Sequence, residues 1–169
     1  LAQELGGRVR VHQKFQTAVV LPPNAMLVAA PLWIKEGREP FHIDVATSRT
    51  EFYDYPAALP VVEHASIRQD LFRRDFTINA MAVSLKGAEY GTVLDFFGGL
   101  TDLQTGVIRV LHNLSFIEDP TRIFRAVRYE NRYGFRMDEQ TRALAKGCVD
   151  MHLVGDLSSA RLRDELIAL

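Results

Sequence analysis

Alternating and β-branched apolar positions dominate the first part of the chain. Arg8–Val11 alternates polar and apolar residues, and Thr17–Leu21 is a β-branched apolar run that ends at a proline pair. These patterns predict a strand in each segment. Residues 24–40 begin as an apolar run and continue as a polar turn, which fits a long hairpin. Phe41–Ala46 again alternates and predicts another strand.

Turn-forming residues divide the middle of the chain into short segments. Residues 47–70 contain separated prolines, so we expect mostly loop with a short helix there. Phe76–Leu85 fits a passage from helix to strand. Thr92–Phe97 and Val107–Leu111 are short apolar runs bounded by glycines, and they predict short strands.

The hydrophobic period becomes helical from Asp119 onward. Asp119 is followed by a proline, a start signal in which the aspartate is the N-cap and the proline the first helical residue. A rival start at Ser115 would place that proline deeper in the helix, which is costly. Gly134 is expected to end this helix, and the pattern predicts further helices over 138–149 and 158–169.

Strands first and helices last predict an α+β protein. We expect a strand-rich domain over residues 1–113 and a helical domain beginning at 114 and running through 169. The 169 residues are 47% hydrophobic with a formal net charge of −1, which argues against a disordered tail and against a global basic field. The single cysteine excludes an internal disulfide framework and fits a cytoplasmic location, and the apolar runs are too short to span a membrane.

Adjacent arginines suggest a phosphate-binding segment. Arg73 and Arg74 precede Asp75 and Asn79 among apolar neighbours. A guanidinium group matches phosphate oxygens in bidentate geometry, and acid and amide side chains can bond sugar hydroxyls. The same residues also fit a solvated charge pair followed by a capped helix, and the residues alone do not decide between the two.

Further candidates are an aspartate and an arginine on one helix, and a single aspartate on a predicted strand. Asp119 and Arg122, with Arg125 one turn on, could present an acceptor and donors to a nucleobase edge. Taken alone, the residues favour the simpler interpretation, a capped helix with a surface Asp–Arg ion pair. Asp44 offers an oxygen ligand for Mg²⁺, but one carboxylate cannot hold two metal ions, and a solvent-facing strand end is the simpler interpretation.

Several segments, in this order, resemble the class II tRNA nucleotidyltransferase and bacterial poly(A) polymerase family. Arg73–Ala80 is similar to the family's RRDFTIN motif without a mismatch, and the resemblance covers nearly the whole chain except Ala25–Pro40. The other matching segments are Ile43–Glu51 (the third-carboxylate strand and an R-x-E), Leu94–Gly99 (D-x-F-G-G), Ile108–Leu111, and Glu118–Arg128 (E-D-P-x-R-x-x-R-A-x-R).

The resemblance implies a palm-like mixed sheet with helices, followed by a helical neck. It implies a template-independent enzyme that uses Mg²⁺ and ATP or CTP to add A and/or C to the 3′ end of tRNA or another RNA, releasing pyrophosphate. The implied roles are Asp44 as catalytic carboxylate and metal ligand, Arg73 and Arg74 at the triphosphate, Asp75 and Asn79 near the ribose, Asp119 and Arg122 at the base, Arg125 in support, and Arg161 from an S-x-E-R motif whose glutamate is Ala160 here.

One departure from the family pattern concerns the metal site. The family places a Gly-Gly turn and an Asp-x-Asp pair upstream of Leu5–Val9, and neither is present here. We therefore expect the 169-residue piece to be inactive alone. The alternatives are a poly(A) polymerase, an enzyme that adds only A, and a noncatalytic RNA- or nucleotide-binding module; the oligomeric state is open.

Overall fold

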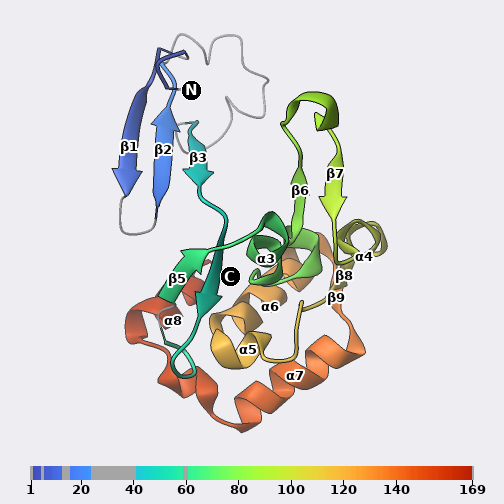
Figure 1. The fold of residues 1–169 in the computed structure, drawn as a ribbon. Coiled ribbons are helices and arrows are strands. Elements are labelled where there is room, and N and C mark those ends of the chain that lie inside the picture. The colour runs from blue at the N-terminus through green and yellow to red at the C-terminus, as the bar shows by residue number, and fades with distance from the viewer. Residues whose placement is uncertain (1, 5, 13–15, 24–40, 59–60, 169) are drawn as a thin grey trace. The chain divides into compact units, whose positions relative to one another are not determined.

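The structure is a computed structural model that describes residues 2–4, 6–12, 16–23, 41–58 and 61–168 (Figure 1). The chain divides into two compact units, Leu1–Ser48 and Arg49–Leu169. The hairpin expected over 24–40 lies outside the described residues. The domain boundary expected at residue 114 stays a prediction.

The first unit is built around an antiparallel sheet in the order β1-β2-β3 (Figure 1). The expected strands are confirmed, because each alternating or β-branched segment pairs with its neighbour in the sheet. Val19 of the central strand lies opposite Asp44 in the register. The strands are β1 Arg8–His12, β2 Thr17–Leu21 and β3 Ile43–Ala46.

The second unit contains small sheets, and one of them corrects the loop expected over residues 47–70. In that segment β4 pairs with β5 as an antiparallel hairpin, and the helix α3 follows, capped by Ser66. The strands of this unit are β4 Arg49–Phe52, β5 Val61–His64, β6 Met81–Val83, β7 Val93–Asp95, β8 Val107–Ile108 and β9 Arg136–Met137, and α3 spans Ile67–Phe72.

The helices of the last third begin and end close to where the sequence predicts. Gly134, at φ 69°, ends α6, and Asp138 caps α7 by accepting the backbone N–H of Thr141. No helix among the described residues is long and apolar enough to cross a membrane. The helices are α4 Gly99–Thr105, α5 Ser115–Glu118, α6 Thr121–Tyr133, α7 Glu139–Asp150 and α8 Ser159–Ile167.

The start of α6 differs in detail from the expectation. Ser115 begins a separate short helix, α5, and α6 begins at Thr121. The Asp119 carboxylate nevertheless accepts the backbone N–H of Thr121 at 3.1 Å, so the expected capping bond is present. The backbone of Asp119 is extended (φ −140°, ψ 91°) between the two helices, which separates α5 from α6.

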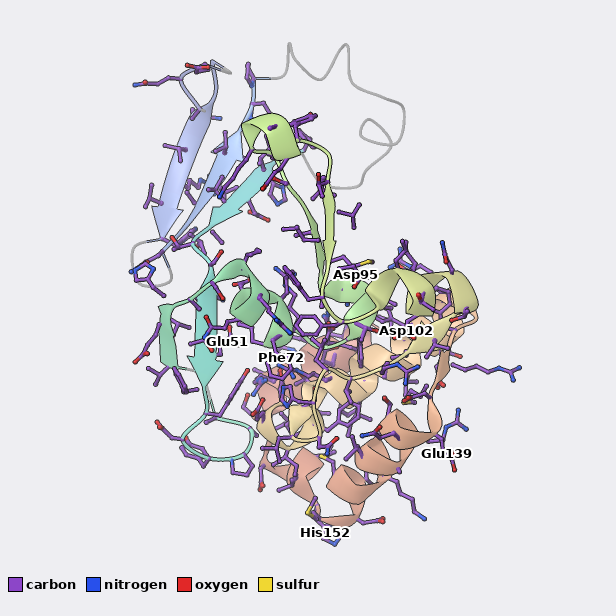
Figure 2. The ribbon with its side chains drawn as sticks, turned by 45° about the vertical axis from the view of Figure 1, so that its right-hand side comes forward. Glu51, Phe72, Asp95, Asp102, Glu139 and His152 are labelled. Atoms are coloured by element: carbon purple, nitrogen blue, oxygen red, sulfur yellow. The ribbon has the colours of Figure 1, made fainter. Side chains whose placement is uncertain are left out.

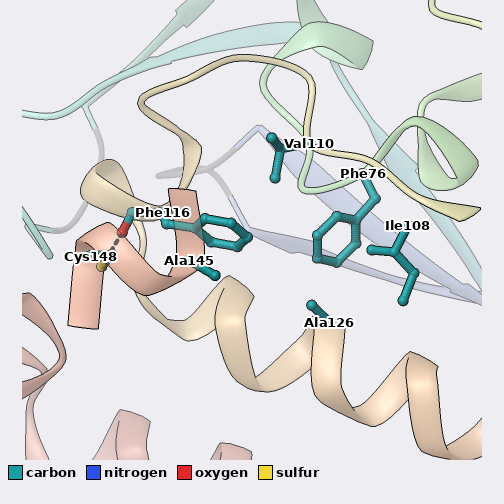
Figure 3. Close-up of a cluster of buried hydrophobic side chains, with 7 residues drawn as sticks. All are labelled: Phe76, Ile108, Val110, Phe116, Ala126, Ala145 and Cys148. Carbon is teal, nitrogen blue, oxygen red and sulfur yellow. Dashed lines mark hydrogen bonds between the residues drawn. The ribbon is translucent and has the colours of Figure 1, made fainter. Parts of the chain in front are cut away.

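One hydrophobic cluster holds the second unit together (Figure 3). Phe76 and Phe116 are fully buried in it, from segments on opposite sides of residue 114. Burying a large aromatic side chain is among the largest apolar contributions to stability that a residue can make. The cluster consists of Phe76, Ile108, Val110, Phe116, Ala126, Ala145 and Cys148.

Gly99 lies where the turn after β7 meets the backbone that precedes β6. A Cβ atom at this position would overlap the carbonyl oxygen of Thr77, which is backbone and cannot rotate away. We expect Gly99→Ala to lower the free energy of unfolding by about 1–3 kcal/mol through overpacking. Urea unfolding measures this. Gly147→Ala is the matched control, because its Cβ meets open space in a helix and should stabilise by about 0.5–1 kcal/mol; equal effects would contradict the steric argument.

Candidate functional site

A cavity of about 660 Å³ in the second unit collects most of the predicted site residues. It lies among β4, the segment that follows α3, and the helices α6 and α8; Figure 2 labels Glu51 on β4. Every predicted nucleotide-binding residue lines it: Arg73, Arg74, Asp75, Asn79, Asp119, Arg122, Arg125 and Arg161. Asp44 belongs to the other unit.

The adjacent arginines differ in their surroundings. Arg73 donates from Nη1 to Glu51 at 2.7 Å, from Nη2 to Asp70 at 2.9 Å, and from Nε to the carbonyl of Arg49 at 3.1 Å. It therefore ties β4 to α3. Arg74 has a single long contact, 3.4 Å to Asp70, and its side chain is 44% exposed. Of the two guanidinium groups, that of Arg74 is the more available to an incoming anion.

Asp70 explains why these arginines separate into different roles. Burial alone would raise the pKa of its carboxyl group, but hydrogen bonds from the Arg49 backbone N–H and from Arg73 outweigh it and hold the pKa below its usual value. The carboxylate is therefore ionised at neutral pH, and its strongest contacts go to Arg73. The positive charge of Arg74 remains largely uncompensated by this partner.

Asp75 is a buried carboxylate at the floor of the cavity. One oxygen accepts from Arg125 Nε at 2.8 Å, and the other accepts from the Asn79 amide at 2.9 Å. Burial by itself would lower the pKa of the Arg125 guanidinium. The negative charge of Asp75, together with the hydrogen bond to it and other nearby groups, outweighs this effect, so the pKa of Arg125 is raised above its usual value. Asn79 also donates to the Tyr129 hydroxyl at 3.2 Å. In this arrangement Asp75 holds the side chains of Arg125 and Asn79 in place.

Arg122 is a buried guanidinium group that makes no ion pair with a described carboxylate, although its charge acts on the nearby Glu118. The residue is 5% exposed, and its donors reach the Ser115 hydroxyl at 2.7 Å and the Arg73 carbonyl at 2.8 Å. Within the part of the chain that the structure describes, it forms no ion pair. A buried charge is costly unless polar groups compensate it, so this site is suited to a ligand acceptor.

Asp119 offers one engaged and one open oxygen. Its Oδ1 accepts from the Thr121 hydroxyl at 2.6 Å and from Arg161 at 2.8 Å, whereas Oδ2 has no hydrogen bond to any residue that the structure describes. Arg161 also donates to the carbonyl of Ala57 at 3.0 Å. Arg161 thus fixes the orientation of Asp119, even though Ala160 stands where the resembling motif has a glutamate.

Sequence reasoning missed the side chains that brace the cavity on its β4 side. The Tyr53 hydroxyl donates to Glu51 at 3.0 Å, and burial followed by the Glu51 charge raises the pKa of Tyr53. Because strand side chains alternate, the spacing of Glu51 and Tyr53 could have placed both on one face. On α6, Tyr129 lies one turn after Arg125, a spacing that puts both on one helix face.

Asp44 stands apart from these groups. Its side chain is 71% exposed, and one of its carboxylate oxygens lies 3.4 Å from Nε2 of His42. The described residues contain no group of three or more His, Cys, Asp or Glu side chains that could hold a metal ion. Mg²⁺ needs several oxygen ligands, so the residues described here do not fit a complete Mg²⁺ site.

The α+β fold, with its small sheets, helical second half and arginine-lined cavity, matches the fold of solved nucleotidyltransferases. Residues 5–109 match the poly A polymerase head domain model, and the chain belongs to that family. The family resemblance and the α+β fold class expected from the sequence are thereby confirmed.

Individual relatives agree with this placement. The chain is 46% identical over its whole length to an A-adding tRNA nucleotidyltransferase of Geobacter sulfurreducens, of which it spans 18%. An apo CCA-adding enzyme superposes with a TM-score of 0.84 at 42% identity, over 97% of this chain and 35% of that one. A tRNA nucleotidyltransferase solved with a primer tRNA and an ATP analogue gives a TM-score of 0.76 at 38% identity, over 98% and 41%.

Proposed function

We propose that the full-length protein adds A and/or C to the 3′ end of tRNA or another RNA without a template, releasing pyrophosphate. The family and the tRNA nucleotidyltransferases similar to this chain support the reaction class. The chain spans 18% of the Geobacter relative, so the activity of the whole protein is an inference from this part of it. We propose a cytoplasmic location, which fits an enzyme that acts on tRNA, as the relatives similar to this chain are named to do.

The presence of Arg122 and Asp119 in the wall of the same cavity carries the proposal. Cytosine and adenine each present an amino group next to a ring nitrogen that accepts hydrogen bonds. The open Oδ2 of Asp119 can accept from that amino group, and the Arg122 guanidinium can donate to the ring nitrogen. Uracil and guanine carry a carbonyl oxygen where the amino group would be, and a carboxylate repels it. Both elements of the pair are held by protein contacts before any ligand arrives.

The remaining cavity residues complete a nucleotide site in this proposal. Arg74 binds the triphosphate, and Arg73 stabilises the adjacent cavity wall through its hydrogen bond to Glu51. Asn79 lies near the ribose and is held in position by its hydrogen bond to Asp75. Arg125 supports Asp75 and can reach a phosphate. Mg²⁺ is the cofactor that the family implies, and Asp44 is the ligand that we propose for it; other acidic ligands have to complete that site.

A single-turnover extension assay tests the proposal. The full-length protein is incubated with each NTP and, in parallel, with tRNA ending before the final A and tRNA lacking the last three nucleotides. We expect one A from ATP on the first RNA, as the similarity to an A-adding enzyme favours. Addition of two C and then A to the second RNA would show a CCA-adding enzyme, and long A tracts a poly(A) polymerase. RNA binding without extension, with Mg²⁺ present, would contradict the proposal in favour of a binding module.

A further inference from the structure

A row of aromatic side chains lies outside the nucleotide cavity. The ring centroids of His112 and Phe72 are 5.2 Å apart, those of Phe72 and Phe97 are 5.6 Å apart, and those of Phe97 and Phe96 are 6.2 Å apart. The guanidinium group of Arg68 lies 5.7 Å from the centre of the Phe96 ring. We call these residues the aromatic ladder. None of them has a role in the proposed nucleotide site.

The ladder is both accessible and firmly held. Phe72 is 44% exposed and Phe96 is 40% exposed, so part of each ring is open to solvent. Phe72 comes from α3, and the turn after Asp95 supplies Phe96 and Phe97 (Figure 2 labels Phe72 and Asp95). The Asp95 carboxylate accepts the backbone N–H groups of Gly99 and Leu100 at 2.9 Å, which fixes that turn.

A second cavity borders both the ladder and the nucleotide cavity. It has a volume of about 460 Å³, and Phe72 and His112 form part of its wall. Glu51, Tyr53 and Arg73 line both cavities, so one hydrogen-bonded partition separates them. The His112 ring is tilted by 38° from the Phe72 ring, and its Nε2 lies 3.5 Å from the Glu118 carboxylate. Burial, followed by the nearby charge of Arg122, lowers the pKa of His112. A ligand on the ladder would thus end next to the nucleotide site.

We propose that the aromatic ladder binds the unpaired bases at the 3′ end of the RNA substrate by stacking. Exposed rings bordered by an arginine are the usual platform for single-stranded nucleic acid, because every base has a stackable face and the guanidinium can meet the backbone. The cavity at the ladder shares Glu51, Tyr53 and Arg73 with the nucleotide cavity, so a strand bound on the ladder lies next to the site where its end is extended. This inference rests on the proposed function, since it supplies a site for the RNA of that reaction.

The test measures RNA binding by the full-length protein and by Phe72 variants. The probes are a fluorescent RNA hairpin with a single-stranded 3′ tail and the same hairpin with a blunt end. We expect Phe72→Leu, which keeps apolar bulk but removes the stacking face, to weaken binding of the tailed RNA by roughly fivefold or more. Binding of the blunt hairpin and the KM for ATP should not change. Phe72→Trp should retain tailed-RNA affinity, and Phe96→Leu should behave like Phe72→Leu.

The control is Tyr90→Leu, an exposed aromatic residue that lies outside the ladder and should bind both RNAs like wild type. If Phe72→Leu and Phe96→Leu bind the tailed RNA as wild type does, or lower the melting temperature without affecting binding, the ladder serves packing and the inference is wrong. If the wild-type protein extends no RNA, the proposed function fails instead. If the wild-type protein extends RNA but Phe72→Leu binds the tailed RNA as wild type does, the ladder proposal is wrong and the proposed function stands.

Discussion

Arg74→Ala in the full-length protein is expected to raise the KM for the nucleotide and to lower kcat, reducing kcat/KM by roughly 10-fold to 100-fold for each phosphate hydrogen bond lost. The estimate follows from the ~1.5–3 kcal/mol that a hydrogen bond to a charged group contributes. The structure supports this prediction, because the Arg74 guanidinium is exposed and makes only a long contact of 3.4 Å with Asp70. Arg74→Lys should recover only part of the loss, since an ammonium group lacks the fork geometry. Steady-state kinetics with ATP measure both variants.

Arg73 is the matched control for this prediction. Because its donors reach Glu51, Asp70 and a backbone carbonyl, Arg73→Ala should act mainly on stability, lowering the unfolding free energy by about 1–3 kcal/mol. Arg74→Ala, with a single long ion pair, should change stability by less than about 1 kcal/mol. If Arg74→Ala keeps wild-type kinetics, the exposed arginine is a surface charge and the triphosphate binds elsewhere.

The helical third of the fold could be predicted because its signals are local. A capping side chain at Asp138 and a left-handed Gly134 act within a few residues of the helix end that they determine. The β4–β5 hairpin gives no such local signal. Its first strand pairs with β5, and the carboxylate of Asp70 on α3 accepts the Arg49 backbone N–H at 3.0 Å. A pattern read over neighbouring residues does not contain that contact.

The candidate site shows the same division. The sequence motifs identify the residues that gather at the cavity, but they do not show how deeply each residue is buried or what it contacts. Arg122 is an example, because its burial and its hydrogen bonds to Ser115 and to the Arg73 carbonyl depend on tertiary packing. Arg73 and Arg74 are also indistinguishable in the sequence, whereas in the structure Arg73 donates hydrogen bonds to the carboxylates of Glu51 and Asp70. Motifs therefore predict which residues meet, and the contacts decide how each one is used.

Asp119→Ala in the full-length protein is expected to blur the choice of nucleotide. Losing the acceptor at Oδ2 removes the partner for the amino group of A or C and costs ~1–3 kcal/mol, so selectivity against GTP and UTP should fall by roughly tenfold to a hundredfold. If Asp119 only caps α6, the same change costs ~1 kcal/mol of stability and leaves the ratios of kcat/KM among the nucleotides unaltered. Kinetics with the four NTPs, together with a thermal unfolding curve, separate these outcomes.

Asp119→Asn distinguishes the two roles more sharply, because asparagine caps a helix about as well as aspartate. The amide oxygen can keep the Oδ1 contacts to Thr121 and Arg161, which places the NH₂ group where Oδ2 now has no hydrogen-bond partner among the described residues. That NH₂ repels an amino group and can donate to a carbonyl oxygen. Addition of A or C should therefore fall relative to addition of G or U, with the protein still folded. An unchanged preference on RNA that wild type extends would leave Asp119 as a helix cap and nothing more.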